Sequence, residues 1–558
     1  MSWTKVDDVW VVHADEPGPL RATLTFRVGK ADETLPTNGI THLVEHLTLF
    51  PLGQRPHYQN GSVRTSVTTF DTSGEPEEVA RFLTGVCTGL SSLPVDRLET
   101  EVRVLDTEAG KRGYGTSSAL LSWRFGPAGP GLWSFDEFAT ATVDGAALQQ
   151  WATERFTREN AVLVLSAPPP PGLTLPLPPG PRRDVPALEE VLPATPAWFR
   201  HGFPDVAALA PVPRSVAAVA YSYALQNALV DKLRFELGVA YSPTVDYDPY
   251  DGSTALMWIT GDSHPEHLDQ VAQVLAGTIA SLADDGTSSE RLEEYRTNAR
   301  KLWDSPDASV ALAYTAAMEL LMTGAVTPLQ QRIAEVEAVT LDDVHAFART
   351  VRDSLLYGLP EGAELTAGQA EPAPELSTEE PVEGTSHALI GGNSRSDRMV
   401  VAPEGISGVR ADGVHATVRF ATARAVLAWP DGRRVLIAPD GVTVTVEPTL
   451  WESGEQIVTV VDAATAGVRV PRTARNPEDI PLPPTPPSTG LGRLWERQNG
   501  RRSTGSWLMI GSAAVILLVA ATTFGSSGQT SSSSGAGIAR TILITIGVLA
   551  GVFGLSRK

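Results

Sequence analysis

The stretch Gly39-Ile40-Thr41-His42-Leu43-Val44-Glu45-His46-Leu47 carries the most informative pattern in this chain, H-x-x-E-H. It is the inverse of the common zinc-binding pattern H-E-x-x-H. On a helix, His42, Glu45 and His46 stand at positions i, i+3 and i+4 and share one face. Two imidazoles one turn apart can bind a single Zn²⁺, and the carboxylate between them can reach a water on the metal. The stretch therefore predicts a helix that holds part of a metal site.

The pattern is specific for a chain of this composition. With 10 histidines in 558 residues, an H-x-x-E-H is expected by chance on the order of 0.01 times. The alternative is a helix that carries two unrelated histidines.

A second segment can complete the metal site, because catalytic zinc usually has three protein ligands and one open position. In the predicted helix Leu98-Glu99-Thr100-Glu101-Val102-Arg103-Val104-Leu105-Asp106-Thr107-Glu108, Glu101 and Glu108 are two turns apart and face the same way. The alternative is a solvated acidic face, which is the usual position of such residues. Glu108 is the candidate third ligand.

Together these two segments resemble the pitrilysin, insulinase and mitochondrial-processing-peptidase family of zinc metallopeptidases. The resemblance implies that His42, His46 and Glu108 bind Zn²⁺ and that Glu45 is the general base. It also implies that Glu101 orients one of the ligands from outside the metal site. The interval between His46 and Glu108 is shorter than is usual in the family.

Between these segments, the stretch from Asn60 to Phe70 alternates and is rich in residues that favour strands. In the family, the matching strand is an exposed sheet edge that pairs with the substrate backbone. The alternative is an ordinary strand of the sheet.

A further segment, Asp231-Lys232-Leu233-Arg234-Phe235-Glu236-Leu237-Gly238-Val239-Ala240-Tyr241-Ser242, resembles the signature of the family's non-catalytic half. The resemblance implies that Arg234 and Tyr241 reach the substrate carbonyl near the zinc. A cation and a phenol are suited to stabilising the oxyanion of a tetrahedral intermediate. No second H-x-x-E-H occurs in the sequence, so only one half is expected to bind metal.

The length of 558 residues predicts several domains, and we expect an α+β chain that begins with two similar α/β halves. The halves are 1–166, which carries the metal motif, and 187–355, joined by a stiff proline-rich linker over 167–186. Strands are expected over 20–28, 161–166 and 255–260. Helices are expected over 38–50, 77–90, 95–112, 267–284 and 289–305, and within 216–237.

The remainder of the chain changes character. Residues 356–385 predict a flexible acidic linker. Residues 386–474 predict a small all-β module of pleckstrin-like or barrel type. Its strands are expected over 416–420, 425–429, 434–437, 442–446 and 457–461. Residues 475–502 form a proline-rich and basic segment.

The last segment, 503–558, predicts a transmembrane helical hairpin. The runs Trp507–Phe524 and Thr541–Leu555 carry no charge, and a Gly- and Ser-rich loop separates them. Arginines precede the first run, and Arg557 and Lys558 follow the second, so the positive-inside rule predicts that both flanks are cytoplasmic. Arg540, at the outer end of the second run, departs from this rule. The polar N-terminus lacks the apolar core of a signal peptide, and the lone Cys87 is expected to be a buried structural thiol. The expected location is the cell membrane, with the catalytic part facing the cytoplasm.

These observations predict a membrane-anchored zinc metalloendopeptidase that cleaves peptides or unfolded segments with zinc-activated water. The net charge of −21 excludes nucleic acid as a favoured partner. The expected partners are a peptide or protein substrate, the bilayer, and a second copy or a related subunit, because the family's chamber needs two such two-half units. One alternative is a non-catalytic scaffold or assembly subunit. The other is a lipid- or protein-binding protein that works through the β module.

Overall fold

The computed structural model describes residues 1–483, apart from 54–57, 110–113, 306–307, 367, 376–378 and 392–396. These residues form two compact units, and the chain passes from the first to the second between Ala373 and Pro374. Within the described part of the chain, no helix is long and apolar enough to cross a membrane. The expected spans Trp507–Phe524 and Thr541–Leu555 lie outside the described residues.

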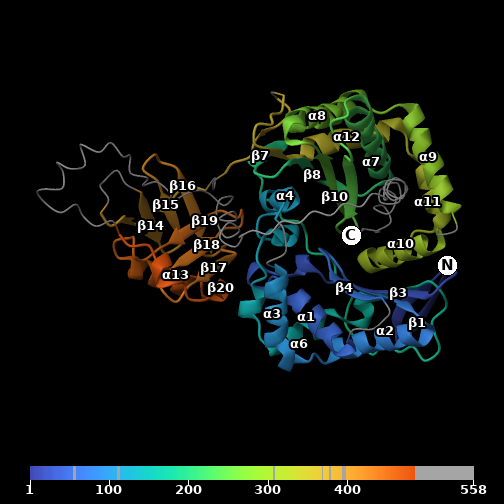
Figure 1. Cartoon of the computed structure of the whole chain (residues 1–558), viewed down its shortest axis with the longest axis horizontal. Coiled ribbons are helices and arrows are strands. Elements are labelled where there is room, and N and C mark those ends of the chain that lie inside the picture. The colour runs from blue at the N-terminus through green and yellow to red at the C-terminus, as the bar shows by residue number, and fades with distance from the viewer. Residues whose placement is uncertain are drawn as a thin grey trace, which may run out of the picture. The chain divides into compact units, whose positions relative to one another are not determined.

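The first unit contains two six-stranded mixed sheets (Figure 1). The first sheet has the order β1-β2-β6-β3-β5-β4 and the second β12-β7-β11-β8-β10-β9. In both sheets the second and third strands of this order are parallel to each other. Each later strand in the order is antiparallel to the one before it. The expectation of two similar α/β halves is therefore confirmed at the level of strand order.

The strands of the first sheet are β1 (Ser2–Val6), β2 (Val9–His13), β3 (Leu20–Phe26), β4 (Gln59–Val63), β5 (Thr68–Gly74) and β6 (Ala161–Leu165). The helices of this half are α1 (Ile40–Leu49), α2 (Pro76–Ser91), α3 (Leu98–Ala109), α4 (Thr116–Phe125), α5 (Ala139–Thr142) and α6 (Gly145–Arg155). Figure 1 shows α1, α2 and α6 on the side of this sheet that faces away from the second half.

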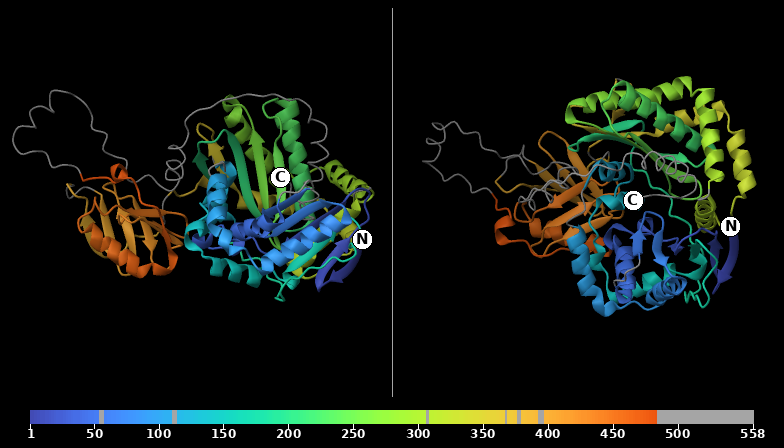
Figure 2. Two further views of the ribbon diagram at one scale, coloured as in Figure 1. Left: turned by 60° about the horizontal axis from the view of Figure 1, so that its bottom comes forward. Right: turned by 45° about the vertical axis from the view of Figure 1, so that its right-hand side comes forward.

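The strands of the second sheet are β7 (Ala197–His201), β8 (Asp205–Pro213), β9 (Thr244–Pro249), β10 (Thr254–Asp262), β11 (Leu356–Pro360) and β12 (Glu371–Pro372). The helices are α7 (Val216–Leu229), the π-helix η7 (Val230–Glu236), α8 (Leu268–Asp285), α9 (Ser289–Trp303), α10 (Ala308–Thr323), α11 (Leu329–Ala338) and α12 (Leu341–Ser354). Figure 2 shows both sheets, blue and green, from two further sides.

The two halves are tied together by packing as well as by the chain. In α10, Ala313, Ala317 and Leu321 cover the face of the first sheet that carries Val12 and Val162. Residues 167–186 form no helix or strand and contain a turn at 171–172, and Leu173, Leu175 and Leu177 are buried in the core of the first half. The proline-rich linker is therefore packed along much of its length, because its alternate leucines face the core.

Two sequence expectations for this unit need correction. The stretch Asn60–Phe70 forms the two strands β4 and β5 of a hairpin, because the backbone of residues 64 and 65 pairs with Lys30 and Ala31 at the turn. The second half also extends beyond residue 355, since β11 is fully buried within the second sheet. The apolar run Leu356-Tyr357-Gly358-Leu359-Pro360 therefore belongs to the core of this half, although acidic residues follow it.

The second unit, as far as it is described, has two four-stranded sheets and one α-helix. Its elements are β13 (Thr385–Ala388), β14 (Arg398–Ala402), β15 (Gly405–Val409), β16 (His415–Arg419), β17 (Ala425–Ala428), β18 (Arg434–Ile437), β19 (Thr443–Val446), α13 (Gly454–Ala464) and β20 (Arg469–Pro471). The prediction of a strand over Ile457–Val461, and with it of an all-β module, is wrong. Ile457 and Val461 are buried one helical turn apart, whereas Val460 is exposed, which is the spacing of an amphipathic helix.

The lone cysteine behaves as expected. Cys87 is fully buried in α2, and burial raises the pKa of its thiol well above the usual range. It is a structural thiol of the first core.

Candidate metal centre

Helix α1 presents the H-x-x-E-H residues from a firmly packed base. Leu43, Val44 and Leu47 are fully buried in the first core, and each contributes about 1.5–3 kcal/mol by burial. The opposite face carries the two histidines, whose ring centroids are 4.8 Å apart. The apolar face of the helix therefore fixes the direction of its polar face.

The start of α1 is held by a buried carboxylate. Glu33 accepts hydrogen bonds from the backbone N–H groups of Gly39, at 2.7 Å, and Thr41, at 2.9 Å. A carboxylate at this position satisfies two of the free N–H groups of the first turn and also complements the helix dipole. Gly39 has a φ of 97°, a conformation that favours glycine.

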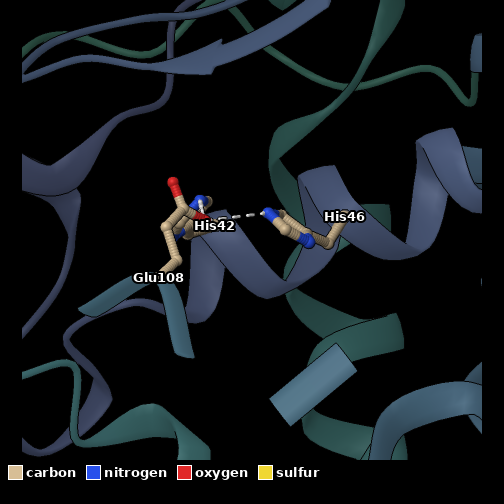
Figure 3. A group of neighbouring side chains, drawn as sticks. All are labelled: His42, His46 and Glu108. Carbon is tan, nitrogen blue, oxygen red and sulfur yellow. Dashed lines mark ion pairs between the residues drawn. The ribbon is translucent and has the colours of Figure 1, made fainter. Parts of the chain in front are cut away.

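Glu108, near the end of α3, meets the two histidines (Figure 3). Its Oε2 atom lies 3.9 Å from the Nε2 atom of His42 and 3.7 Å from that of His46. One potential ligand atom from each of the three residues lies within 4.8 Å of the other two. The structure thus brings together the three residues that the sequence predicted as metal ligands.

The spacing of these atoms fits zinc. Ligands at about 2.0–2.2 Å from a tetrahedral Zn²⁺ lie roughly 3.3–3.6 Å from one another. The two distances to Glu108 exceed this range by a few tenths of an ångström, and the ligand atoms of the two histidines lie within 4.8 Å of each other. Two imidazoles and one carboxylate form a ligand set that catalytic zinc uses, and Glu108, about half exposed, leaves one side open.

Glu45 lies beside the cluster as a fourth side chain and its second carboxylate. Its Oε2 atom is 4.0 Å from the Nε2 atom of His42 and 3.8 Å from that of His46, and its side chain is buried. The carboxylate therefore faces the same point as the three candidate ligands.

The edge strand β4 leaves space for this carboxylate at Gly61. A methyl group built on Gly61 would lie 1.9 Å from the Oε1 atom of Glu45. Strand β4 is one of the two edge strands of the first sheet among the described strands, and the resemblance implied an edge strand here. Glycine at this position allows the strand and the carboxylate to approach closely.

We therefore expect Gly61→Ala to displace Glu45 and to lower kcat/KM by about 10–100-fold for any hydrolysis in which this carboxylate is the general base, since small misplacements of a catalytic group carry such costs. Zinc content should be unchanged, because the three nearest atoms to the added methyl group all belong to Glu45, which is not a candidate ligand. The matched control is Gly202→Ala, whose added methyl group meets nothing within 4 Å. Equal activities of the two variants would contradict the expected displacement.

Each histidine also contacts a carboxylate through its Nδ1 atom. His46 lies 3.4 Å from Glu101, in agreement with the contact that the resemblance implied. His42 lies 2.9 Å from the Oε2 atom of Glu137. The sequence reading missed Glu137, because it is 95 residues from His42 in a loop with no recognisable motif. Only the fold brings the two together.

Arg234 and Tyr241 come together in the second half, on and just after the π-helix η7. The guanidinium carbon of Arg234 lies 4.9 Å from the ring centroid of Tyr241 and 5.5 Å from that of Phe235. Tyr241 and Phe235 are exposed by 61% and 71%. The segment offers a cation and a phenol on an accessible surface, and their role toward a substrate stays a prediction.

Comparisons with known proteins agree with this fold. Residues 142–299 match the family described as Peptidase M16 inactive domain. This range contains Arg234 and Tyr241 but none of the H-x-x-E-H residues. No curated protein matches the chain.

Solved structures with a similar fold include a protease from Helicobacter pylori, with 13% identity, a TM-score of 0.53, and coverage of 64% of this chain and 98% of that one. A peptidase M16 inactive domain from Pseudomonas fluorescens has 14% identity, a TM-score of 0.51, and coverage of 67% and 99%. The periplasmic protease PqqL from Escherichia coli has 13% identity, a TM-score of 0.53, and coverage of 75% and 55%. The chain thus has an α/β fold similar to that of M16 peptidases, with a match to their inactive domain over residues 142–299.

Proposed function

We propose that this chain is a zinc metalloendopeptidase that cleaves peptides or unfolded protein segments. The observation that carries the proposal is the convergence of His42, His46 and Glu108 with Glu45 beside them. A chance pair of helical histidines has no reason to meet a glutamate from another helix within 4 Å of both imidazoles.

When bound, zinc supplies a Lewis acid that polarises a peptide carbonyl and lowers the pKa of a nearby water. Glu45 takes the proton of the attacking water and delivers it to the leaving amine. The buried position of Glu45, about 4 Å from both Nε2 atoms, holds it within reach of the water. His42, His46 and Glu108 serve as the ligands.

Strand β4 provides a place for the substrate. An extended peptide can add to an exposed sheet edge by backbone hydrogen bonds, which select for strand conformation more than for particular side chains. Because Gly61 of β4 lies against Glu45, a peptide on this edge would pass next to the general base. This arrangement favours peptides and unfolded segments as substrates.

Arg234 and Tyr241 are proposed to stabilise the oxyanion of the tetrahedral intermediate. Loss of one such donor typically costs 10²–10³ in kcat. We therefore expect Arg234→Gln and Tyr241→Phe each to lower kcat by about that factor, with zinc content unchanged. Arg349→Gln, an exposed substitution on α12 of the same half, is the control. Wild-type kcat in both variants would remove these residues from the proposed site.

The membrane anchor and the assembly belong to the same proposal. The uncharged runs within 503–558 are proposed to fix the chain in the cell membrane, with the catalytic halves facing the cytoplasm. A homodimer, or a heterodimer with a related subunit, would enclose the substrate in the manner of the family.

A second candidate is a non-catalytic scaffold subunit, because the match to an inactive domain covers only residues 142–299 and leaves the H-x-x-E-H half unmatched. The two functions are separated by incubating the purified full chain, loaded with zinc, with a quenched fluorescent peptide library. We expect cleavage. A chain that is folded and zinc-loaded but cleaves no peptide, alone or with its partner subunit, would favour the scaffold.

A further inference from the structure

Behind each candidate zinc-binding histidine lies a short series of charged side chains, each in contact with the next. The Nδ1 atom of His46 lies 3.4 Å from Oε2 of Glu101, and the other oxygen of Glu101 lies 3.4 Å from a guanidinium nitrogen of Arg97. The Nδ1 atom of His42 lies 2.9 Å from Oε2 of Glu137, and the other oxygen of Glu137 lies 3.1 Å from the Nζ atom of Lys30. A carboxylate on Nδ1 accepts its proton and leaves the Nε2 lone pair for a metal.

The series of charged side chains behind His42 is more deeply buried than the series behind His46. The side chains of Lys30 and Glu137 are 3% and 7% exposed, whereas that of Arg97 is 36% exposed. The distances on the His42 side are also shorter at both steps. Water screens a buried ion pair much less than an exposed one. The contacts of Glu137 with His42 and Lys30 should therefore be held more firmly than those of Glu101 with His46 and Arg97.

The charged side chains behind His42 also contact a residue that holds the start of helix α1. The Nζ atom of Lys30 lies 4.0 Å from Glu33, whose carboxylate binds the first N–H groups of α1. The same Nζ atom is 4.8 Å from the centre of the Trp133 ring. A methyl group on Gly39 would lie 2.6 Å from the Cβ atom of Glu137. Glycine at the start of the helix thus lets Glu137 approach, and Lys30 holds two carboxylates in fixed positions.

We propose that Glu137, and through it Lys30, are the main positioning residues of the metal centre, with a larger effect on zinc affinity than Glu101 and Arg97. The proposal rests on the proposed function, because it assumes that His42 binds zinc. It assigns the dominant supporting carboxylate to a residue outside both sequence motifs. Lys30 fixes the rotation of the Glu137 carboxylate, and Glu137 fixes the ring of His42 with Nε2 toward the metal.

The test measures the zinc affinity of the full chain by competition with a chelator of known affinity. It compares the wild type with Glu137→Gln and Lys30→Met, and with the matched pair Glu101→Gln and Arg97→Met. We expect the first two substitutions to lower zinc affinity by about 10–100-fold, the usual range for a partner of a metal ligand, and the matched pair to have a smaller effect. Circular dichroism and the melting temperature in EDTA show whether each variant folds like the wild type, and if Lys30→Met does not, Glu137→Gln decides alone.

The absorption spectrum of the Co²⁺-loaded chain gives a second reading. The visible bands should shift in Glu137→Gln, because the orientation of the His42 ring changes the ligand field. Unchanged zinc affinity in Glu137→Gln, or an equal or larger loss in Glu101→Gln, would overturn the inference while leaving the proposed function intact. A wild-type chain that binds no zinc would overturn both.

Discussion

Replacement of Glu45 by glutamine should nearly abolish peptide cleavage. Glutamine keeps the size of the side chain but cannot take a proton from water, and general acid–base catalysis usually contributes 10²–10⁴ in rate. We therefore expect kcat to fall by about 10³–10⁴, at the upper end of that range because Glu45 is proposed to act in both proton transfers. The measurement is the steady-state rate of cleavage of a quenched fluorescent peptide.

The zinc content of Glu45→Gln should remain that of the wild type, because Glu45 is not among the three candidate ligands. Glu99→Gln, an exposed change on α3, is the matched control and should keep full activity. If Glu45→Gln cleaved the peptide at the wild-type rate, another group would have to be the base. The inactive variant would also retain uncleaved substrates and would help to identify them by mass spectrometry.

Removal of a metal ligand should reduce activity as strongly as Glu45→Gln does, but with a loss of bound zinc. His46→Ala takes one imidazole from a site with three protein ligands, and Glu108→Gln removes the only charged ligand. Loss of a residue that only hydrogen-bonds to a metal ligand typically lowers metal affinity by about 10–100-fold. We expect each of these variants to lower zinc affinity by more than that and to abolish activity at low zinc concentration. Metal analysis after dialysis, with Glu99→Gln as the control, measures the loss.

Glu108→Gln is the more informative of the two variants. The interval from His46 to Glu108 is shorter than is usual in the family, yet the Oε2 atom of Glu108 lies 3.7 Å from the Nε2 atom of His46. Full zinc occupancy in Glu108→Gln would show that another group completes the site.

The motif residues were predictable because their relation is local. Residues three, four and seven positions apart share a helix face whatever the rest of the fold is. The meeting of Glu108 with the histidines came from the family resemblance, and the structure shows the packing of α3 beside α1 that brings it about.

Gly61, Glu137 and Lys30 could not be predicted in the same way. Gly61 lies beside Glu45 and Glu137 beside His42, and Lys30 contacts Glu137 in turn, only because segments far apart in the sequence converge near α1. Such contacts depend on tertiary packing, and a single sequence carries no local pattern for them.

The errors in secondary structure have similar causes. The β4–β5 turn contains Arg64-Thr65-Ser66-Val67, with no Gly, Pro, Asn or Asp to mark it. The run Ile457–Val461 consists entirely of β-branched residues, so its local preference favours a strand. Burial of Ile457 and Val461 against the core of the second unit makes it a helix instead.

The most direct test of the account is the coordination of zinc in the purified full-length chain, measured by zinc K-edge X-ray absorption. We predict one zinc with two imidazole nitrogens at about 2.0–2.1 Å and two oxygen ligands, one from Glu108 and one from water or substrate. A spectrum with sulfur ligands, or with no imidazole signal, would contradict the proposed centre. So would a chain that holds no zinc after dialysis against buffer that contains the metal.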